Sequence, residues 1–365
     1  MGHHDEHKHE DHAHDHDHPN PHEHEHDHGH SHSNNPVIHW LQHLFTPHSH
    51  GHQQAALDPN LATDRGMWAL KVSFAGLMVT AIFQVVIVII SSSVALLADT
   101  IHNFSDALTA IPLGFAFWLS RRARNKRYTY GYGRAEDIAG VIIVLMIAYS
   151  AFEAIRHAIL RFITPEPIMN LGWVAVAAII GFIGNELVAI FRIKVGKEIG
   201  SAALIADGYH ARTDGFTSLA VLAGTIGVWL GYPILDPLIG LGIGIAILGI
   251  VWHTAKDMWH RMMDAVEPEL YEEFKHIASH VDGVMDVHSA AIRWVGHRLW
   301  SEMHVTVNCK LSVLEGHRIV EEVRHNLFHE FPALVEINIH ADPCECDESV
   351  EYHPTAHHQF LHAAD

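Results

Sequence analysis

Six long apolar runs occupy the middle of this 365-residue chain and restrict its fold more than any other feature. A helix needs about 20 mostly apolar residues to span a bilayer, and the runs come close to that length or exceed it. A soluble helical core does not contain so many runs of this length. The sequence therefore predicts a polytopic α-helical membrane protein with six transmembrane helices, at Trp68–Ser91, Val94–Ser120, Ile138–Ile159, Leu171–Ile193, Ser201–Leu230 and Leu235–Val251.

Charge alternates along the connections between these spans. One set of connections carries Lys and Arg, at 121–127, 192–197 and 256–261, whereas the others carry neither. Connections rich in Lys and Arg remain on the cytoplasmic side of a membrane. Both termini are therefore predicted to lie in the cytoplasm.

The first 52 residues can form neither a span nor a core. They hold about half of the 37 histidines, and within residues 1–30 histidine alternates with Asp and Glu. So polar a segment is expected to be disordered, and its composition is typical of loose metal binding; a solvated tail or an expression tag is the alternative. The candidate ligands of this metal-buffering tail are His12, His14, His16, His18, His24, His26 and His28.

Composition divides the chain into four predicted parts. A disordered cytosolic tail at 1–66 precedes the membrane domain at 67–263, and a charged segment at 264–346 is followed by a second His-rich tail at 347–365. The only three cysteines are too few for a disulfide framework, so a reduced compartment is expected. Two of them form the sequence Cys344-Glu-Cys346, which is a weak signal for metal binding.

One pattern of twelve residues occurs twice, as ADTIHNFSDALT at 98–109 and as ADGYHARTDGFT at 206–217. Each copy places a histidine four residues before an aspartate, and residues so spaced lie on the same face of a helix. Two such helices that face each other offer two imidazoles and two carboxylates to one point. That set suits a tetrahedral divalent metal, Zn²⁺ first, with Co²⁺ and Ni²⁺ close in affinity and Cd²⁺ or Fe²⁺ left open.

Both copies of the motif lie within predicted spans, the second and the fifth. An ionisable side chain near the bilayer centre costs roughly 2.5–3.5 kcal/mol and by default marks a transport path. Asp99 and Asp207 precede the two histidines by three residues and are expected to orient an imidazole or to lie as charges in the vestibule. Asn185 and Glu186, in the fourth span, are interpreted as hydrogen-bonding partners between helices. The predicted transport metal site consists of His102, Asp106, His210 and Asp214.

After Asp264 the chain takes the pattern of a soluble domain. Gly296-His297 joins two alternating segments as a hairpin turn, and Ser312-Val-Leu-Glu315 is a capping box at the start of a helix. The order helix–strand–strand–helix–strand indicates a small α+β sandwich. Its predicted elements are the helix Glu267–His280, the strands Val287–Val295 and Arg298–Asn308, a helix from Ser312 to about Glu330, and the strand Glu336–His340.

These features together resemble the cation diffusion facilitator family, whose zinc-transporter-like members are divalent metal/proton antiporters. The resemblance rests on the six spans, on the His-x-x-x-Asp motif in the second and fifth, and on the soluble domain, and it covers about residues 68–343. It implies a cytosolic domain with a ferredoxin- or metallochaperone-like fold that forms a homodimer and binds metal. The regulatory metal ligands that it implies are His304, His317, His340 and Asp342.

The connection after the second span carries Tyr130-Gly-Tyr-Gly-Arg-Ala-Glu136, which is similar to a motif of the same family. Some members use histidines there for a second metal site at the membrane surface. This chain has Tyr128 and Tyr132 instead, so no such site is expected. The resemblance also pairs Arg134 with Asp264 as a charge interlock at the cytoplasmic face of the dimer.

The sequence thus predicts a transporter, not an enzyme, that exports divalent metal, Zn²⁺ first, from the cytoplasm in exchange for protons. Imidazole binds metal only in its neutral form, so His102 and His210 would couple the two flows. The expected location is a bacterial inner or plasma membrane, with no nucleic-acid partner. Two alternatives stay open: efflux of Co²⁺, Ni²⁺, Cd²⁺ or Fe²⁺ by the same mechanism, and a membrane-anchored metal sensor or storage protein without flux.

One local resemblance points elsewhere. The stretch His102-Asn-Phe-Ser-Asp106 is also similar to a motif of the zinc importers. Those proteins have more spans and a partner motif of the HExxH type, which this chain lacks. The importer interpretation is therefore set aside.

Overall fold

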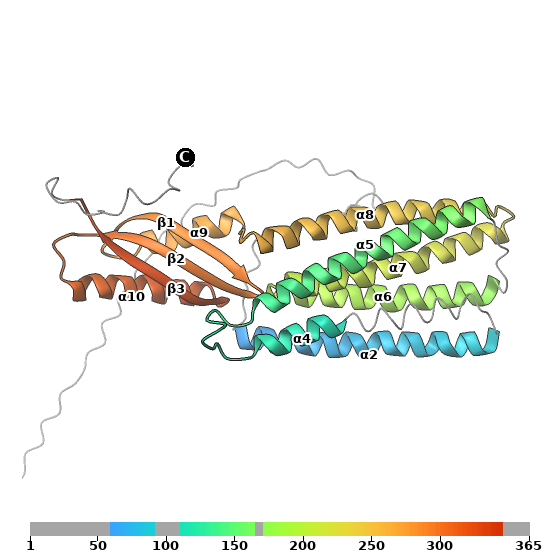
Figure 1. The fold of residues 1–365 in the computed structure, drawn as a ribbon, viewed down its shortest axis with the longest axis horizontal. Helices are drawn as coiled ribbons and strands as arrows, with labels where there is room; N and C mark the ends of the chain where they lie inside the picture. Colours follow the sequence, from blue (N-terminus) through green and yellow to red (C-terminus); the bar gives the residue numbers. More distant parts are fainter. Residues whose placement is uncertain (1–58, 92–109, 165–170, 346–365) are drawn as a thin grey trace, which may run out of the picture. The chain divides into compact units, whose positions relative to one another are not determined.

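The structure, a computed structural model, describes residues 59–91, 110–164 and 171–345 (Figure 1). The predicted features that fall outside these ranges are the metal-buffering tail, the C-terminal His-rich tail, Cys346, and three residues of the first motif copy: the predicted ligands His102 and Asp106, and Asp99.

Within the described ranges, six helices that run side by side precede the soluble domain (Figure 1). All of them occupy the segments that the apolar runs predict. They are α2 (Pro59–Ser91), α4 (Ala110–Ser120), α5 (Arg134–Ile163), α6 (Leu171–Ile199), α7 (Ala202–Trp229) and α8 (Leu235–Met262).

The outer surfaces of these helices are those of a membrane protein. In the described part of the chain, α2, α5, α6 and α8 are each long and apolar enough to cross a bilayer. Large apolar side chains such as Ile89, Leu145 and Trp252 are 72%, 64% and 76% exposed. Apolar surface of this extent is stable only against lipid or another protein. The prediction of a multi-pass helical membrane domain is confirmed.

Four of the helices, α2, α5, α6 and α8, are longer than their predicted spans. α2 begins at Pro59, nine residues before the predicted start at Trp68. The added turns carry charged residues, and Arg65 forms an ion pair with Glu198 near the end of α6, with Nε and Oε1 3.3 Å apart. Hydropathy detects only the part of a helix that lies in lipid, whereas hydrogen bonding continues the helix into water.

α7 is the most enclosed of these helices. It packs against α5, α6 and α8, and most of its side chains are buried. Its approach to α6 depends on Gly208, because a Cβ there would lie only 3.0 Å from the main-chain nitrogen of Ile193. Small residues at such crossings allow helix backbones to pack closely in membranes.

The soluble domain has the predicted order of elements. β1 and β2 are antiparallel, β2 and β3 are parallel, and the sheet order is β1-β2-β3. Because parallel strands need a crossover connection, α10 links β2 to β3. The elements are α9 (Pro268–Ser279), β1 (Val284–Val295), β2 (Arg298–Val307), α10 (Val313–Glu330) and β3 (Leu334–Pro343).

One core joins the two helices to one face of this sheet. Phe274 of α9 stacks on Phe331 just after α10, with ring centroids 4.0 Å apart, and Met303 and Val305 of β2 are buried with them. The capping box is confirmed, since the Glu315 N–H donates to Ser312 Oγ and the Ser312 N–H donates to the Glu315 carboxylate. The Ser312 hydroxyl also donates to that carboxylate. These hydrogen bonds hold the pKa of Glu315 below its usual value. Among the described residues, no helix of this domain covers the opposite face of the sheet, which is here called its open face (Figure 1).

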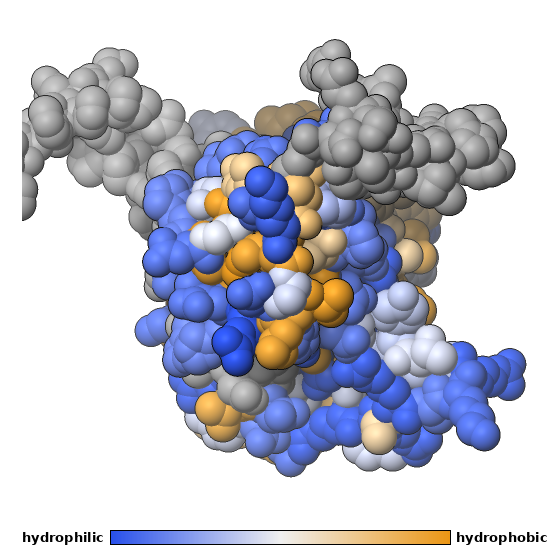
Figure 2. Space-filling model, turned by 90° about the vertical axis from the view of Figure 1, so that its left-hand side faces the viewer, coloured by the Kyte–Doolittle hydropathy of each residue, from blue (hydrophilic) through white to orange (hydrophobic). Residues whose placement is uncertain are grey.

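The surface of the molecule on the side of this domain carries both apolar and hydrophilic residues (Figure 2). Figure 2 looks onto the side that lies at the left of Figure 1 and shows apolar residues gathered among hydrophilic ones. The large apolar side chains that the soluble domain exposes are Met285, Val313 and Leu314.

Two cysteines of the soluble domain are bonded to each other. Cys309 follows β2 and Cys344 follows β3, and the two form a disulfide. The sequence analysis, which expected no disulfide framework, did not predict this bond. The spacing along the chain could not reveal it, because the parallel pairing of β2 with β3 brings the two residues together.

The predicted turn at Gly296-His297 connects the soluble domain to the membrane helices. The Gly296 N–H donates to Asp137 Oδ2 at 3.1 Å. The buried His297 ring contacts Glu136 Oε2 through Nδ1 at 2.7 Å and Thr63 Oγ1 through Nε2 at 2.9 Å. The turn thus contacts the first turn of α5 and the first turns of α2.

We predict that Gly296→Ala lowers the melting temperature of the purified full-length protein. Gly296 has φ of +63°, and a Cβ would lie 2.7 Å from Glu136 Oε2 and 2.9 Å from Gly133 O. A left-handed conformation alone costs a residue with a Cβ about 1–2 kcal/mol.

The matched control is Gly316→Ala in α10, where an added Cβ meets nothing within 4 Å. That change is expected to leave the melting temperature unchanged or to raise it, because Ala is favoured over Gly in a helix by about 0.5–1 kcal/mol. Equal melting temperatures for Gly296→Ala and the parent would contradict the docking of the turn.

Candidate functional site

The second copy of the repeated motif lies on one face of α7. His210 Nε2 and Asp214 Oδ2 are 3.9 Å apart, and their side chains are only 2% and 3% exposed. The four-residue spacing stacks them on consecutive turns, as predicted. Because the first copy lies outside the described residues, the structure shows the α7 half of the predicted site and not how His102 and Asp106 lie.

Asp207 has a partner that the sequence analysis missed. Its Oδ2 lies 3.0 Å from Arg192 Nη1 of α6, and both side chains are almost fully buried. Arg192 Nε also donates to Ser73 Oγ of α2 at 2.9 Å. The sequence analysis assigned Arg192 to a basic connection. Its place within a predicted span was a usable signal, because an ionisable residue there needs a partner.

A second ion pair joins the same two helices. Arg212 Nη2 of α7 lies 2.8 Å from Glu186 Oε1 of α6, and both side chains are mostly buried. The interpretation of Glu186 as a hydrogen-bonding partner between helices is confirmed. Of the ionisable residues on α7, Asp207 and Arg212 are therefore each paired with a residue of opposite charge on α6.

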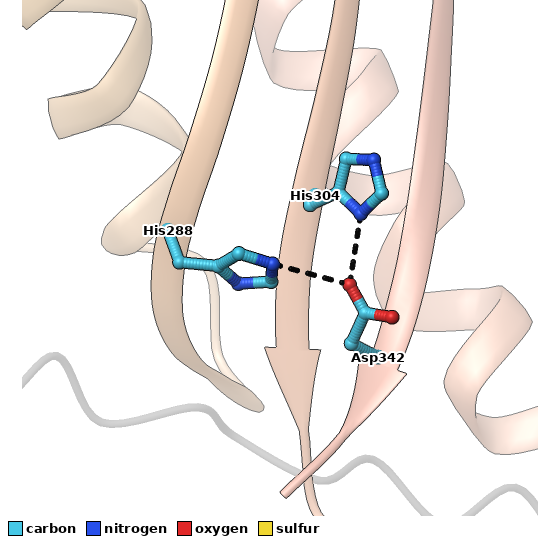
Figure 3. A group of neighbouring side chains, drawn as sticks. All are labelled: His288, His304 and Asp342. Atoms are coloured by element: carbon cyan, nitrogen blue, oxygen red, sulfur yellow. Dashed lines mark hydrogen bonds and ion pairs between the residues drawn. The ribbon is translucent and has the colours of Figure 1, made fainter. Parts of the chain in front are cut away.

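The open face of the soluble domain carries a cluster of imidazoles around one carboxylate (Figure 3). Asp342 Oδ2 lies 2.9 Å from His304 Nδ1 and 3.3 Å from His288 Nε2, and Asp342 Oδ1 lies 3.1 Å from His340 Nε2. The Asp342 side chain is buried, whereas the three histidines are exposed to solvent. The donor atoms of His288, His304 and Asp342 all lie within 4.8 Å of one another, and such a set of nitrogen and oxygen donors is suited to Zn²⁺ or a similar ion.

Strand register builds this cluster. His304 of β2 pairs directly with His340 of β3, and Asp342 is two residues further along the same face of β3. In β2, His304 alternates with the buried Met303 and Val305, so its ring points away from the core. His288 lies where the register of β1 against β2 shifts, between Val287 and Ser289.

The cluster differs from the predicted regulatory site in two residues. His317 is exposed on α10 and, within the described part of the chain, forms no hydrogen bond or ion pair with the three other predicted ligands. His288 was missed, although it lies in a predicted strand, because its inclusion depends on the irregular register of β1.

Arg134 and Asp264, the predicted charge interlock, form an ion pair within one chain. Arg134 at the start of α5 donates to Asp264, which follows α8, and Arg134 Nη1 donates to the carbonyl oxygen of Arg261 at 3.1 Å. Arg293 of β1 lies 3.8 Å from the same Asp264 carboxylate. The membrane helices and the soluble domain therefore share this carboxylate.

Comparison with known proteins gives matches to both parts of the chain. Residues 70–263 match the family model of the cation efflux transmembrane domain, and residues 266–344 match that of the cation efflux protein cytoplasmic domain. A probable cation efflux system protein of Mycobacterium tuberculosis (strain H37Rv) is 47% identical over 310 residues, which cover 85% of this chain and 93% of the relative.

More distant relatives differ in what their names describe. The manganese efflux system protein MneP of Bacillus subtilis is 26% identical and covers 78% of this chain and 99% of its own length. The magnetosome protein MamB of Magnetospira sp. is 27% identical, and the match covers 72% of this chain and 89% of MamB. Among solved structures, a nickel form of the MamM CTD is 23% identical, covers 22% of this chain and 100% of its own, and has a TM-score of 0.21.

We predict that Asp207→Ala strongly destabilises the protein, because it leaves the buried Arg192 guanidinium without its counter-charge. Breaking a buried ion pair in this way typically costs about 3–5 kcal/mol. The measurement is the melting temperature of the purified protein in detergent.

Glu198→Ala is the matched control, since Glu198 and its partner Arg65 are both partly exposed to solvent. Exposed pairs contribute at most about 1 kcal/mol. If both variants lose the same small amount, the Arg192–Asp207 pair does not stabilise the helix bundle.

Proposed function

Because this chain belongs to the cation efflux family of membrane transporters, we propose that it exports Zn²⁺ from the cytoplasm by proton antiport through His102, Asp106, His210 and Asp214. Membership in a transporter family also decides against an enzyme and against a sensor or store without flux. Protons and metal would use the same ligands in turn. Both termini would lie in the cytoplasm of a bacterial cell, and the chain would act as a homodimer.

The observation that supports this site is the burial of His210 and Asp214 in the middle of the helix bundle. Their side chains are 2% and 3% exposed, and an ionisable pair placed so deeply in a membrane domain marks a transport path by default. The matching frame of His102 and Asp106 in the predicted second span would complete a tetrahedral set. Asp207 is excluded from this set, because Arg192 already balances its charge.

Proton coupling follows from the chemistry of imidazole. The ring accepts a metal ion only when neutral, and its ordinary pKa of about 6.5 places that change near physiological pH. At the cytoplasmic side, His102 and His210 would lose protons as metal binds. At the outer side, protonation of the same rings would release the metal, and rocking of the helices around a fixed site would alternate access.

The choice of Zn²⁺ rests on the donor set. Two imidazoles and two carboxylates suit a borderline ion without a geometric preference of its own. Co²⁺ and Ni²⁺ follow closely on the same ligands, and the relatives include a protein named for manganese efflux. We therefore propose Zn²⁺ first and Co²⁺ or Ni²⁺, then Cd²⁺ or Fe²⁺, as alternatives for the same mechanism.

Asp214→Asn and His210→Ala are expected to reduce metal uptake into inside-out vesicles with an acidic interior by at least about tenfold, as lost metal ligation does. In the parent, uptake is expected to dissipate the pH gradient. Uptake by Asp214→Asn at the parental rate would exclude this ligand set, and parental uptake without dependence on the gradient would exclude antiport.

The chain offers a control with the same spacing. His253 and Asp257 of α8 also stand four residues apart, with Nε2 and Oδ2 separated by 3.5 Å, but they are 42% and 46% exposed. His253→Ala and Asp257→Asn are expected to transport at the parental rate. Their loss of transport would show that the spacing alone, and not burial, decides the site.

We propose a regulatory role for the cluster around Asp342, which would lie in the cytoplasm. Three imidazoles converge on one buried carboxylate, so cytosolic metal that binds there would stabilise the soluble domain. The match to the cytoplasmic domain model supports dimerisation through this domain, and the exposed Met285, Val313 and Leu314 give it apolar surface for that contact.

Zn²⁺ is expected to slow amide hydrogen exchange in β2 and β3 of the full-length protein. At a free concentration of 100 times the dissociation constant, binding stabilises the native state by about 2.7 kcal/mol, or about a hundredfold in exchange. Asp342→Ala should abolish this protection. The double variant His276→Ala/His280→Ala removes two adjacent imidazoles, at α9 and just after it, and should retain it; the reverse pattern would place the ion at α9.

A further inference from the structure

The disulfide between Cys309 and Cys344 lies at the end of the sheet that carries the Asp342 cluster. Cys309 follows β2 and Cys344 follows β3, two strands that run parallel to each other. The Cys344 N–H donates to Val307 O at 2.8 Å, which continues the ladder beyond β3. The Cys309 N–H donates to Cys344 Sγ at 3.3 Å. Main-chain N–H groups therefore hold Cys344 and its sulfur atom at the end of β2.

The compartment of this domain conflicts with a permanent disulfide. Residues 266–344 match a cytoplasmic domain, and cytosolic thiols are kept reduced by the glutathione and thioredoxin systems. In that compartment, a close pair of cysteines indicates metal binding or reversible redox chemistry more often than a structural bond. The same pair thus has two stable states, a disulfide and two adjacent thiols.

The neighbours of the pair are metal-binding groups. Cys344 is two residues beyond Asp342, so the two side chains leave the same face of the extended strand. Asp342 in turn contacts His304 and His288. The chain therefore places Cys344, one of the two bonded cysteines, on the same strand face as Asp342 and two residues beyond it. Sulfur donors raise the preference of a site for Zn²⁺ and for softer ions such as Cd²⁺.

We propose that reduced Cys309 and Cys344 form a second cytoplasmic metal site for Zn²⁺ or Cd²⁺, and that the disulfide is its closed form. This site is additional to the transport site and to the Asp342 cluster. The two sulfurs would supply two of four tetrahedral positions, with water or a neighbouring donor in the others. Cys346 lies outside the described residues and is not part of the proposal.

The two forms interconvert by a balanced two-electron step. Reduction breaks the S–S bond with two electrons and two protons from a cytosolic dithiol, which becomes a disulfide itself. Oxidation by a disulfide or azo compound takes two electrons and two protons from the thiols and forms the S–S bond again. Oxidising conditions would thus remove two metal ligands from the cytoplasmic domain without altering the Asp342 cluster.

Absorption of Co²⁺ tests the site in the purified full-length protein, reduced and freed of reductant without oxygen. Sulfur bonded to Co²⁺ gives a charge-transfer band that nitrogen and oxygen ligands do not give, so the His-rich tails do not interfere. The reduced parent should show the band. It should vanish in Cys309→Ser, in Cys344→Ser and in the parent oxidised with an azo compound.

Two control variants separate this site from its surroundings. Cys346→Ser should keep the band, and His304→Ala should keep it as well, even if the regulatory role of the Asp342 cluster is wrong. No band in the reduced parent would overturn the proposal. A band that is lost in Cys346→Ser and kept in Cys309→Ser would overturn it too.

A measurement without variants covers the case in which a cysteine substitution impairs folding. Zn²⁺ or Cd²⁺ should slow the alkylation of Cys309 and Cys344 in the reduced parent by at least tenfold, as read by mass spectrometry of the two peptides. Alkylation at the same rate with and without metal would exclude metal binding by the pair.

Discussion

Ionisable side chains inside a bilayer must be compensated, and the membrane domain is arranged around this requirement. α7 carries Asp207, His210, Arg212 and Asp214 within about two turns, all of them largely buried. α6 supplies Arg192 for the first and Glu186 for the third. The charges that α6 balances fix α7 in the bundle, whereas His210 and Asp214 are the pair proposed to hold exchangeable ions. The close α6–α7 packing at Gly208 brings the charges of α6 within reach of α7 and encloses His210 and Asp214.

The sequence predicts the parts of this structure that depend on local pattern. Apolar length identifies the membrane helices, two-residue alternation identifies the strands, and the capping box at Ser312 marks the start of α10. The helix ends at Pro59 and Ile199 extend past the predictions, because helical hydrogen bonding does not require lipid. Local pattern also places His210 and Asp214 on one face, since i and i+4 are fixed by helix geometry.

The contacts that were not predicted from the sequence all join residues that lie on different helices or strands. Arg192 meets Asp207 only through helix packing, His288 joins Asp342 through an irregular strand register, and Cys309 meets Cys344 through a parallel crossover. The comparison of α7 with α8 makes the same point. His253 and Asp257 repeat the spacing of His210 and Asp214, but only tertiary burial distinguishes the two pairs.

The hairpin turn of the soluble domain has a mechanical consequence for transport. His297 contacts Thr63 of α2 and Glu136 of α5 at once, through opposite nitrogens of a single buried ring. If α2 and α5 separate at these ends during transport, one of these hydrogen bonds must break. If they remain together, the soluble domain must travel with both. In either case, movement of the sheet is coupled to movement of the membrane helices through this one buried ring.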